Sequence, residues 1–210
     1  MISTVLFDFD GTLANTNQLI INSFKHIYSV FHNNECDEAY ITSTFGEPLL
    51  TTMNRDFGAY NMEDVLACYR EYQNERFNNE VTLYDNVPEV LEYLKKKGVK
   101  LGIVTSRLRN STEEAIKSFN IEKYFEVVIT ANDTEKHKPH KEPLMMALKA
   151  VNSKPQETYY VGDSRFDMEC AINAGAVPIL AGWQEGSKEL AEKYNIKYVL
   201  DNMWNLTKLI

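Results

Sequence analysis

The chain lacks any uninterrupted stretch of about 20 apolar residues, the length that a helix needs to cross a bilayer. It is also short of basic residues, with 22 Lys and Arg against 30 Asp and Glu and a formal net charge of −8. Binding to nucleic-acid phosphates or to anionic lipids requires a concentrated basic face. We therefore expect neither a nucleic-acid partner nor a membrane partner.

Cysteine is scarce as well. Cys36, Cys68 and Cys170 are far apart, and no CxxC pair occurs. This odd and dispersed set predicts neither a disulfide framework nor a zinc knuckle. The first four residues show no basic segment leading into the apolar core of a signal peptide. Together these features predict a protein of the reducing cytoplasm.

What the chain does have is an alternation of short apolar runs with helical patterns. Runs typical of buried strands lie at residues 4–7, 101–104, 127–129, 159–161, 177–180 and 198–200. Between them, Pro88 lies near the first turn of a helix that ends at Gly98, Pro143 opens another helix, and Ser111 with Glu114 predicts a capping box. Strands separated by helices pair in parallel through right-handed crossovers. The sequence therefore predicts a doubly wound, mostly parallel α/β sheet.

One long segment interrupts this alternation. From about Asn15 to Asn79 the pattern is helical, as shown by the spacing of Ile20, Phe24 and Ile27. We therefore predict an α/β core made of residues 1–14 and 83–210, and a small helical cap made of residues 15–82. The predicted cap holds four basic and ten acidic residues, a net charge of −6.

The polar residues that follow the strands are the candidates for chemistry, because ligands of such sheets bind at the carboxyl ends of the strands. Asp8 and Asp10 place two carboxylates at the end of the first strand, and Gly11 allows a close approach of the backbone. An ordinary Asp-Gly turn would explain Asp10 and Gly11 alone. Two acids at the end of a buried strand are harder to explain, since unpaired carboxylates are costly there.

Three further segments follow later strands. Thr105 and Ser106 offer hydroxyl and N–H groups to a phosphate oxygen, although a helix cap or a turn would use the same residues. Lys138 could neutralise a phosphoryl group, although a solvated loop lysine is the simpler reading of it alone. Asp163 and Asp167 share one face of a helical turn, where an N-cap and an exposed acid are the alternatives. Together with the carboxylates of the first segment, they would form an oxygen-rich pocket suited to Mg²⁺.

In this order and strand context, the segments 8–13, 105–106, 138–139 and 162–167 resemble the four motifs of the haloacid dehalogenase-like hydrolase superfamily. The similarity covers essentially the whole chain, and Asp8 to Leu13 resembles the diagnostic DxDGT motif of that family. The helical segment after the first strand resembles the small cap of the phosphoglycolate phosphatase branch. Within this branch the chain looks most like bacterial pyrophosphatases of the PpaX type. Asn15 departs from the pattern, since many relatives have Asp there, and we expect this to affect the cap linker more than the chemistry.

The resemblance implies a Mg²⁺-dependent phosphatase that acts on a small phosphate ester or on pyrophosphate. Asp8 would be the nucleophile that forms an aspartyl-phosphate, and Asp10 would be the general acid and base. The family pattern further assigns phosphate binding to Thr105, Ser106 and Lys138, and Mg²⁺ binding to Asp8, the Asp10 carbonyl and Asp163, with Asp167 as a ligand or a partner behind the ligands.

The predicted cap would contact the substrate through the loop at Gly46, although a plain turn between helices is an equal alternative. Arg107 or Arg55 would meet a second phosphate or a carboxylate of the substrate. The expected partner is a small phosphorylated compound, and the protein is expected to be a monomer or a homodimer.

Other activities remain to be separated from this one. A sugar-phosphate mutase of the β-phosphoglucomutase kind would use the same two aspartates. A catalytically silent binding or regulatory module would be expected to lack one of Asp8, Asp10, Lys138 or Asp163, and all four are present. Dehalogenases of the family lack the second acid of the DxD pair, and the long helical segment argues against a phosphoacceptor domain of the response-regulator kind.

Overall fold

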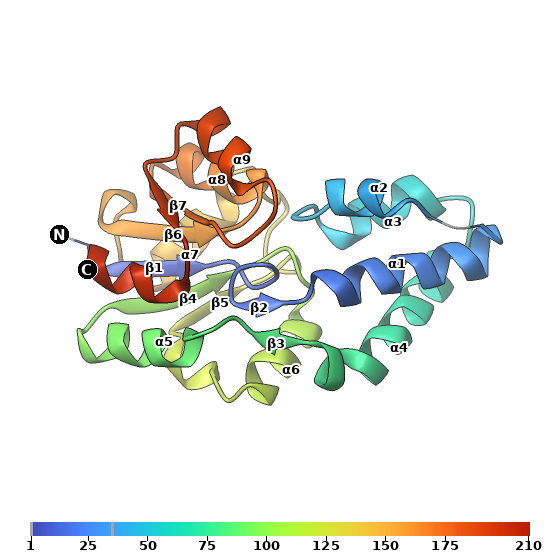
Figure 1. Ribbon diagram of the computed structural model, residues 1–210, viewed down its shortest axis with the longest axis horizontal. Helices are drawn as coiled ribbons and strands as arrows, with labels where there is room; N and C mark the ends of the chain where they lie inside the picture. Colours follow the sequence, from blue (N-terminus) through green and yellow to red (C-terminus); the bar gives the residue numbers. More distant parts are fainter. Residues whose placement is uncertain (1, 35) are drawn as a thin grey trace.

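A parallel sheet of six strands forms the centre of the molecule, in the order β5-β4-β1-β6-β7-β8 (Figure 1). The computed structural model describes residues 2–34 and 36–210. The strands are β1 (Thr4–Phe7), β4 (Lys100–Val104), β5 (Val127–Ile129), β6 (Thr158–Gly162), β7 (Val177–Ala181) and β8 (Tyr198–Leu200). All six predicted strands are confirmed, with bounds that differ by one residue at most.

Helices cover both faces of this sheet, so its strands are apolar on both sides. In β1, Val5 and Phe7 face a cluster that includes residues of α5 (Val87–Lys96), α6 (Arg109–Ser118) and the 3-10 helix η3 (Met203–Leu209). Leu6 faces the opposite way, toward α7 (Glu142–Ala150) and α8 (Arg165–Ala174). Helix α9 (Ser187–Tyr194) packs on this second face, and η1 (Glu122–Tyr124) and η2 (Pro155–Glu157) are short connections. The predicted doubly wound α/β fold is therefore confirmed.

Four helices form a second group beside the carboxyl ends of the strands (Figure 1). They are α1 (Asn17–His32), α2 (Glu38–Ser43), α3 (Leu49–Phe57) and α4 (Met62–Glu80). Their buried apolar side chains form a cluster of their own, which includes Ile27, Met53 and Phe57. Two short antiparallel strands, β2 (Ala14–Asn15) and β3 (Thr82–Leu83), connect this group to the sheet. We call residues 15–82 the helical segment; that it acts as a separate cap domain stays a prediction.

Two local features differ from the sequence-based expectation. The capping box predicted at Ser111 is wrong, because α6 begins at Arg109 and the Ser111 hydroxyl donates instead to the Leu108 carbonyl, at 3.0 Å. A capping box opens α8, where Ser164 and Asp167 bond each other's backbone N–H groups. The strands β2 and β3 were not predicted, since two residues are too few to show a period of two.

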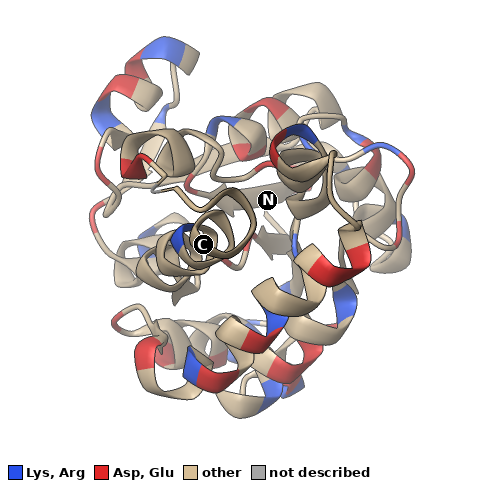
Figure 2. Cartoon of the chain, turned by 90° about the vertical axis from the view of Figure 1, so that its right-hand side faces the viewer, with Lys and Arg blue, Asp and Glu red and all other residues tan. Residues whose placement is uncertain are grey.

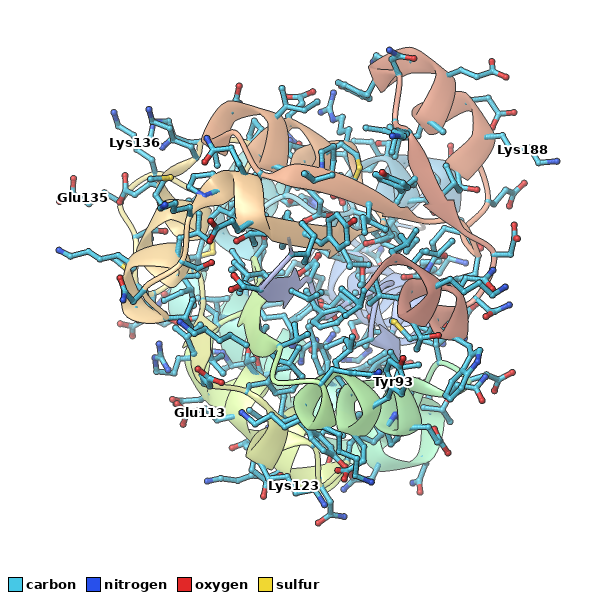
Figure 3. All side chains as sticks on the ribbon, turned by 90° about the vertical axis from the view of Figure 1, so that its left-hand side faces the viewer. Tyr93, Glu113, Lys123, Glu135, Lys136 and Lys188 are labelled. Carbon is cyan, nitrogen blue, oxygen red and sulfur yellow. The ribbon has the colours of Figure 1, made fainter. Side chains whose placement is uncertain are left out.

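Charged side chains are spread over the outer surface of the molecule. Acidic and basic positions alternate along the helices nearest the viewer in Figure 2. On the face away from the helical segment, Lys136 and Lys188 point outward from the ribbon (Figure 3). Among the helices of residues 2–34 and 36–210, none combines the length and the apolar character needed to cross a membrane.

Candidate active site

A cavity of about 550 Å³ lies between the carboxyl ends of the central strands and the helical segment. The residues after β1, β4 and β6 line one side of it, and residues of α1, α4 and the loop between α2 and α3 line the other. Its walls include Asp8, Asp10, Thr105, Ser106, Arg107 and Asp163 from the sheet side and Ile20, Phe24, Gly46, Tyr69 and Arg70 from the helical segment. The cavity is thus polar at the sheet and partly apolar under the helices.

Asp8 lies at the floor of this cavity, directly after β1. Its backbone N–H donates to the Val161 carbonyl, which extends the pairing of β1 with β6 by one residue. One carboxylate oxygen accepts from the backbone N–H of Phe9 at 2.7 Å, and the other lies 3.0 Å from Lys138 Nζ. Asp8 is only 4% exposed, so its carboxylate is held in one orientation with few water contacts.

Lys138 and Asp167 form a buried pair behind Asp8. The Lys138 ammonium donates to Asp167 Oδ1 at 2.7 Å, and both side chains are almost completely buried. The same oxygen of Asp167 accepts from the Tyr160 hydroxyl, and the other oxygen accepts from the backbone N–H and hydroxyl of Ser164. Four donors therefore satisfy Asp167, which fixes Lys138 beside Asp8.

Asp163 completes a group of three carboxylates. Oxygens of Asp8, Asp163 and Asp167 lie within 4.8 Å of one another, close enough to surround one metal ion. Asp163 lines the cavity together with Asp8, and its Oδ1 accepts from the Thr12 hydroxyl at 3.2 Å. Hard carboxylate oxygens at this spacing suit Mg²⁺.

The charges of this group do not balance. Burial raises the pKa of Asp8 to about 7, against the opposing effect of Lys138. Burial, together with the charges of Asp167 and Asp8, also raises the pKa of Asp163 well above its usual value. Burial alone would lower the pKa of Lys138, but the Asp167 and Asp8 carboxylates outweigh this effect and raise it. One ammonium is thus too little positive charge for three buried carboxylates.

Asp10 is kept apart from this group. Its carboxylate accepts from Arg107 Nη1 at 2.8 Å, and 24% of its side chain is exposed. The Arg107 side chain is 9% exposed, and its guanidinium lies over the rings of Phe9 and Phe77. The two acids of the first motif therefore have different surroundings, one beside an ammonium at the floor and one beside a guanidinium on the wall.

The turn between Asp10 and Thr12 depends on glycine. Gly11 has φ +70°, and a Cβ at this position would lie 2.1 Å from Asp163 Oδ2. A side chain would therefore be strained and would collide with the carboxylate group. The backbone of this turn, which follows Asp10, therefore packs directly against the Asp163 carboxylate.

The segment after β4 contacts the helical segment. Thr105 is buried, and its hydroxyl accepts from the backbone N–H of Arg107 at 3.3 Å. The Ser106 hydroxyl donates to the Gly46 carbonyl at 2.9 Å, so it connects the sheet to the loop between α2 and α3. Gly46 also packs on the first residues of α8, because a Cβ there would lie 2.6 Å from Ser164 Oγ. The Ser106 hydroxyl is thus hydrogen-bonded to the helical segment. Thr105 and Ser106 both line the cavity.

Comparison with known proteins agrees with this arrangement. The family model described as haloacid dehalogenase-like hydrolase matches residues 5–181. The chain belongs to this family. It is 38% identical to a pyrophosphatase PpaX of Bacillus mycoides over 209 residues, which covers 100% of this chain and 97% of the relative. It is 35% identical to a pyrophosphatase PpaX of Bacillus thuringiensis, with 100% and 96% covered.

Solved structures of this family share the whole fold. A crystal structure from Lactobacillus plantarum, whose name gives phosphoglycolate phosphatase as a predicted activity, superposes with a TM-score of 0.88 at 26% identity and covers 100% of both chains. A β-phosphoglucomutase from Clostridium difficile superposes with a TM-score of 0.81 at 20% identity, over 98% of this chain and 93% of the other. The second likeness shows the fold alone.

Within the family fold, most of the predicted site residues meet at one place. Asp8, Lys138, Asp163 and Asp167 form one contact group, and Asp10, Thr105, Ser106, Arg107 and Gly46 line the cavity above it. Arg55 does not reach this cavity, because it is bound to Glu47 at 3.0 Å and to Asp56. The expectation that it meets the substrate is therefore not supported by its position.

Sequence reasoning missed two residues that contact the turn at Gly11. Trp183 and Gln184 both donate to the Gly11 carbonyl, at 2.9 and 2.8 Å. Both residues follow β7, so their position after a strand was the signal that could have identified them. The hydrogen bond from Tyr160 to Asp167 was not predicted either, because Tyr160 lies within the apolar run of β6.

Proposed function

We propose that this protein is a Mg²⁺-dependent phosphatase that hydrolyses pyrophosphate or a small phosphate ester through a covalent phosphate on Asp8. The observation that carries the proposal is the separation of two carboxylates at one cavity. Asp8 is held beside Lys138, and Asp10 is held beside Arg107. The relatives named as pyrophosphatases and the Lactobacillus neighbour support this substrate class.

The carboxylate group fits a divalent cation. Asp8, Asp163 and Asp167 carry one Lys138 between them, which leaves two negative charges without a partner. Asp8 and Asp163 would hold Mg²⁺, with the backbone carbonyl of Asp10. Asp167 would act through Lys138, because its oxygens already accept four hydrogen bonds. Bound Mg²⁺ would reduce the repulsion between Asp8 and an anionic phosphate.

The side chains of the site divide the reaction into two steps. Asp8 attacks phosphorus in line, so that an oxygen–phosphorus bond forms while the bond to the leaving oxygen breaks. Asp10 donates a proton to that leaving oxygen and then takes one from the water that releases inorganic phosphate from Asp8. Lys138, Thr105 and the backbone N–H of Ser106 would stabilise the phosphoryl oxygens as charge spreads over them.

The position of Arg107 bears on the substrate. It pairs with Asp10, the group assigned to the leaving oxygen, so it lies on the leaving-group side of the cavity. A second phosphate or a carboxylate on the leaving group would meet this guanidinium. The net charge of −6 on the helical segment disfavours a long polyanion. We therefore favour pyrophosphate or a phosphorylated small acid over a neutral sugar phosphate.

A phosphate-release assay tests the proposal. Pyrophosphate, phosphoglycolate and glucose 6-phosphate would be compared with Mg²⁺ and with EDTA, for the native protein, Asp8→Asn and the surface control Asp64→Asn. We expect release of inorganic phosphate with Mg²⁺ only, and we expect it to be retained in Asp64→Asn and lost in Asp8→Asn. Native protein that is quenched with acid during turnover should carry a covalent phosphate that hydroxylamine removes. Full activity of Asp8→Asn would refute the nucleophile assignment.

The same assay separates the alternatives. A mutase would isomerise a sugar phosphate with little release of inorganic phosphate. A catalytically silent module would release no phosphate from any of the compounds and would carry no covalent phosphate on Asp8. Either result would overturn the phosphatase proposal.

A further inference from the structure

The loop that follows β7 clamps a single carbonyl oxygen of the catalytic turn. Trp183 Nε1 donates to the Gly11 carbonyl at 2.9 Å, and Gln184 Nε2 donates to the same oxygen at 2.8 Å. A carbonyl oxygen has two lone pairs, so this one is fully used. Nothing in the two-step reaction described above requires an indole and an amide at this position, and they need an explanation of their own.

The clamped carbonyl belongs to the residue that follows Asp10. Gly11 lies so close to Asp163 that a Cβ would be 2.1 Å from its carboxylate, and the next residue, Thr12, donates to Asp163 at 3.2 Å. The turn therefore has Asp10 at one end and rests on Asp163 at the other. A shift of the Gly11 carbonyl would move the Asp10 side chain relative to the carboxylates on the floor of the cavity.

Gln184 also contacts both connections to the helical segment. Its Nε2 donates a second hydrogen bond to the Tyr84 hydroxyl at 2.6 Å, and its Oε1 accepts from Asn17 Nδ2 at 2.9 Å. Tyr84 directly follows β3, and Asn17 is the first residue of α1. The whole amide group is thus used, with one bond to the catalytic turn and one to each side of the β2–β3 connection.

We propose that Trp183 and Gln184 are positioning residues that hold Asp10 in the orientation needed for proton transfer, and that Gln184 makes this orientation depend on the placement of the helical segment. The inference rests on the proposed function, since it takes Asp10 as the acid. A rotation of α1 about the β2–β3 connection displaces Asn17 from Gln184 and loosens one of the two donors on the Gly11 carbonyl. Asp10 is then correctly placed only while the helical segment holds its present position.

The choice of leaving group distinguishes this role from a structural one. An alkyl phosphate needs a proton on its leaving oxygen, whereas p-nitrophenolate departs as an anion without one. The second step, hydrolysis of the phosphate on Asp8, is common to both substrates, but kcat/KM reports only the steps up to the transfer of phosphate to Asp8. A misplaced Asp10 therefore lowers kcat/KM more for the alkyl ester than for p-nitrophenyl phosphate. A loss of folded protein slows both substrates by the same factor.

The test compares kcat and KM of Trp183→Phe, Gln184→Ala and Asn17→Ala on phosphoglycolate and on p-nitrophenyl phosphate. Trp183→Phe keeps a ring against Tyr84 but removes the N–H donor, and Asn17→Ala removes only the bond from α1. Trp204→Phe and Gln156→Ala are matched controls at exposed positions. Circular dichroism and thermal melting check that each variant is folded.

We expect Trp183→Phe and Gln184→Ala to lower kcat/KM on phosphoglycolate by roughly 10- to 100-fold, and to lower kcat/KM on p-nitrophenyl phosphate far less. Asn17→Ala should show the same preference to a smaller extent, and the controls should match the native protein. Equal losses on both substrates, or no loss, would overturn the positioning role, and an unchanged Asn17→Ala would overturn the dependence on the helical segment. Failure of the proposed function looks different, because the native protein would then release phosphate from neither ester and not from pyrophosphate either.

Discussion

Four aspartates lie at the carboxyl edge of the sheet, and the neighbouring groups give each carboxylate a different set of partners. Asp167 is satisfied by four donors, Asp8 shares one ammonium, Asp10 pairs with a guanidinium, and Asp163 lines the cavity beside the Thr12 hydroxyl. Lys138 lowers the pKa of Asp8 against the larger effect of burial, and so favours the charged form that a nucleophile needs. Asp10 has 24% of its side chain exposed, so it can exchange a proton with the cavity, as a general acid must.

The raised pKa of Asp8 has a consequence for stability. Its pKa is about 7 in the folded protein against an ordinary value of 3.8, because burial disfavours the charged form. An acid whose pKa is raised on folding destabilises the folded state above its unfolded pKa, increasingly until the folded pKa is passed. In the metal-free protein, Asp8→Asn should therefore raise the free energy of unfolding by about 1–3 kcal/mol at pH 8, after the loss of one Lys138 contact is subtracted.

Urea unfolding of the native protein and Asp8→Asn in EDTA, measured from pH 4 to pH 8, checks this prediction. The advantage of Asp8→Asn should shrink as the pH falls from 7 toward 4 and be small near pH 4, where the pH approaches the pKa of the carboxyl in the unfolded chain. Asp64→Asn, on the exposed side of α4, is the control and should show no such trend. A stability difference that does not vary with pH would contradict the prediction.

At the scale of elements, apolar runs and their order were sufficient to predict the sheet. The central strands β1, β4 and β6 are buried on both faces, so their apolar runs stand out in the sequence, and the helices between the runs imply parallel pairing. Helix beginnings were harder, as the wrong capping box at Ser111 shows. Serine can bond back to the carbonyl three residues earlier as readily as it can cap a helix, and only the backbone path decides between them.

The candidate site was predictable to the extent that it follows strand ends. The residues after β1 and β6, together with Lys138 from the loop after β5, lie together because parallel strands end at one edge. The contact of Gln184 with Gly11 and Asn17 depends instead on the path of a loop after β7. No periodicity or motif in the sequence encodes such a path, so these contacts required coordinates.

The loop between α2 and α3 provides a prediction at the element scale. Gly46 has φ +86°, and a Cβ would lie 2.6 Å from Ser164 Oγ and 2.8 Å from the Phe166 ring. Gly46→Ala should push this loop off α8, break its bond with Ser106 and lower kcat/KM by about 10-fold or more, because a misplaced binding loop costs this much. Steady-state kinetics on the best substrate of the screen measures the change.

Gly98→Ala is the matched control for this substitution. Gly98 has φ +76°, so its replacement brings the same kind of backbone strain, of about 1 kcal/mol, but no atom lies within 4 Å of the added Cβ. Both variants should melt at a lower temperature than the native protein, and only Gly46→Ala should lose activity. Equal activities of the two variants would show that the Gly46 contact does not serve the reaction.

At the scale of the whole molecule, negative charge is concentrated away from the sheet. The helical segment carries a net charge of −6 of the −8 of the chain, and its acidic positions lie among basic ones on the surface (Figure 2). Of the positive groups at the cavity, Lys138 and Arg107 are buried and each is paired with an acid, whereas Arg70 on the side of the helical segment is exposed. At the floor of the cavity, the proposed cation would add the positive charge that the carboxylate group lacks.

This charge balance predicts that Mg²⁺ stabilises the entire fold. A ligand that binds only the folded protein adds about 2.7 kcal/mol at a concentration 100 times its dissociation constant. For a chain of this size that corresponds to a rise in melting temperature of roughly 5–10 °C. Differential scanning fluorimetry in EDTA and in increasing MgCl₂ would measure the rise. Asp163→Asn should abolish it, because Asp163 belongs to the carboxylate group and lines the cavity, whereas Asp64→Asn should leave it intact. A rise of equal size in Asp163→Asn would place the bound cation outside the carboxylate group and remove the electrostatic basis of the proposed site.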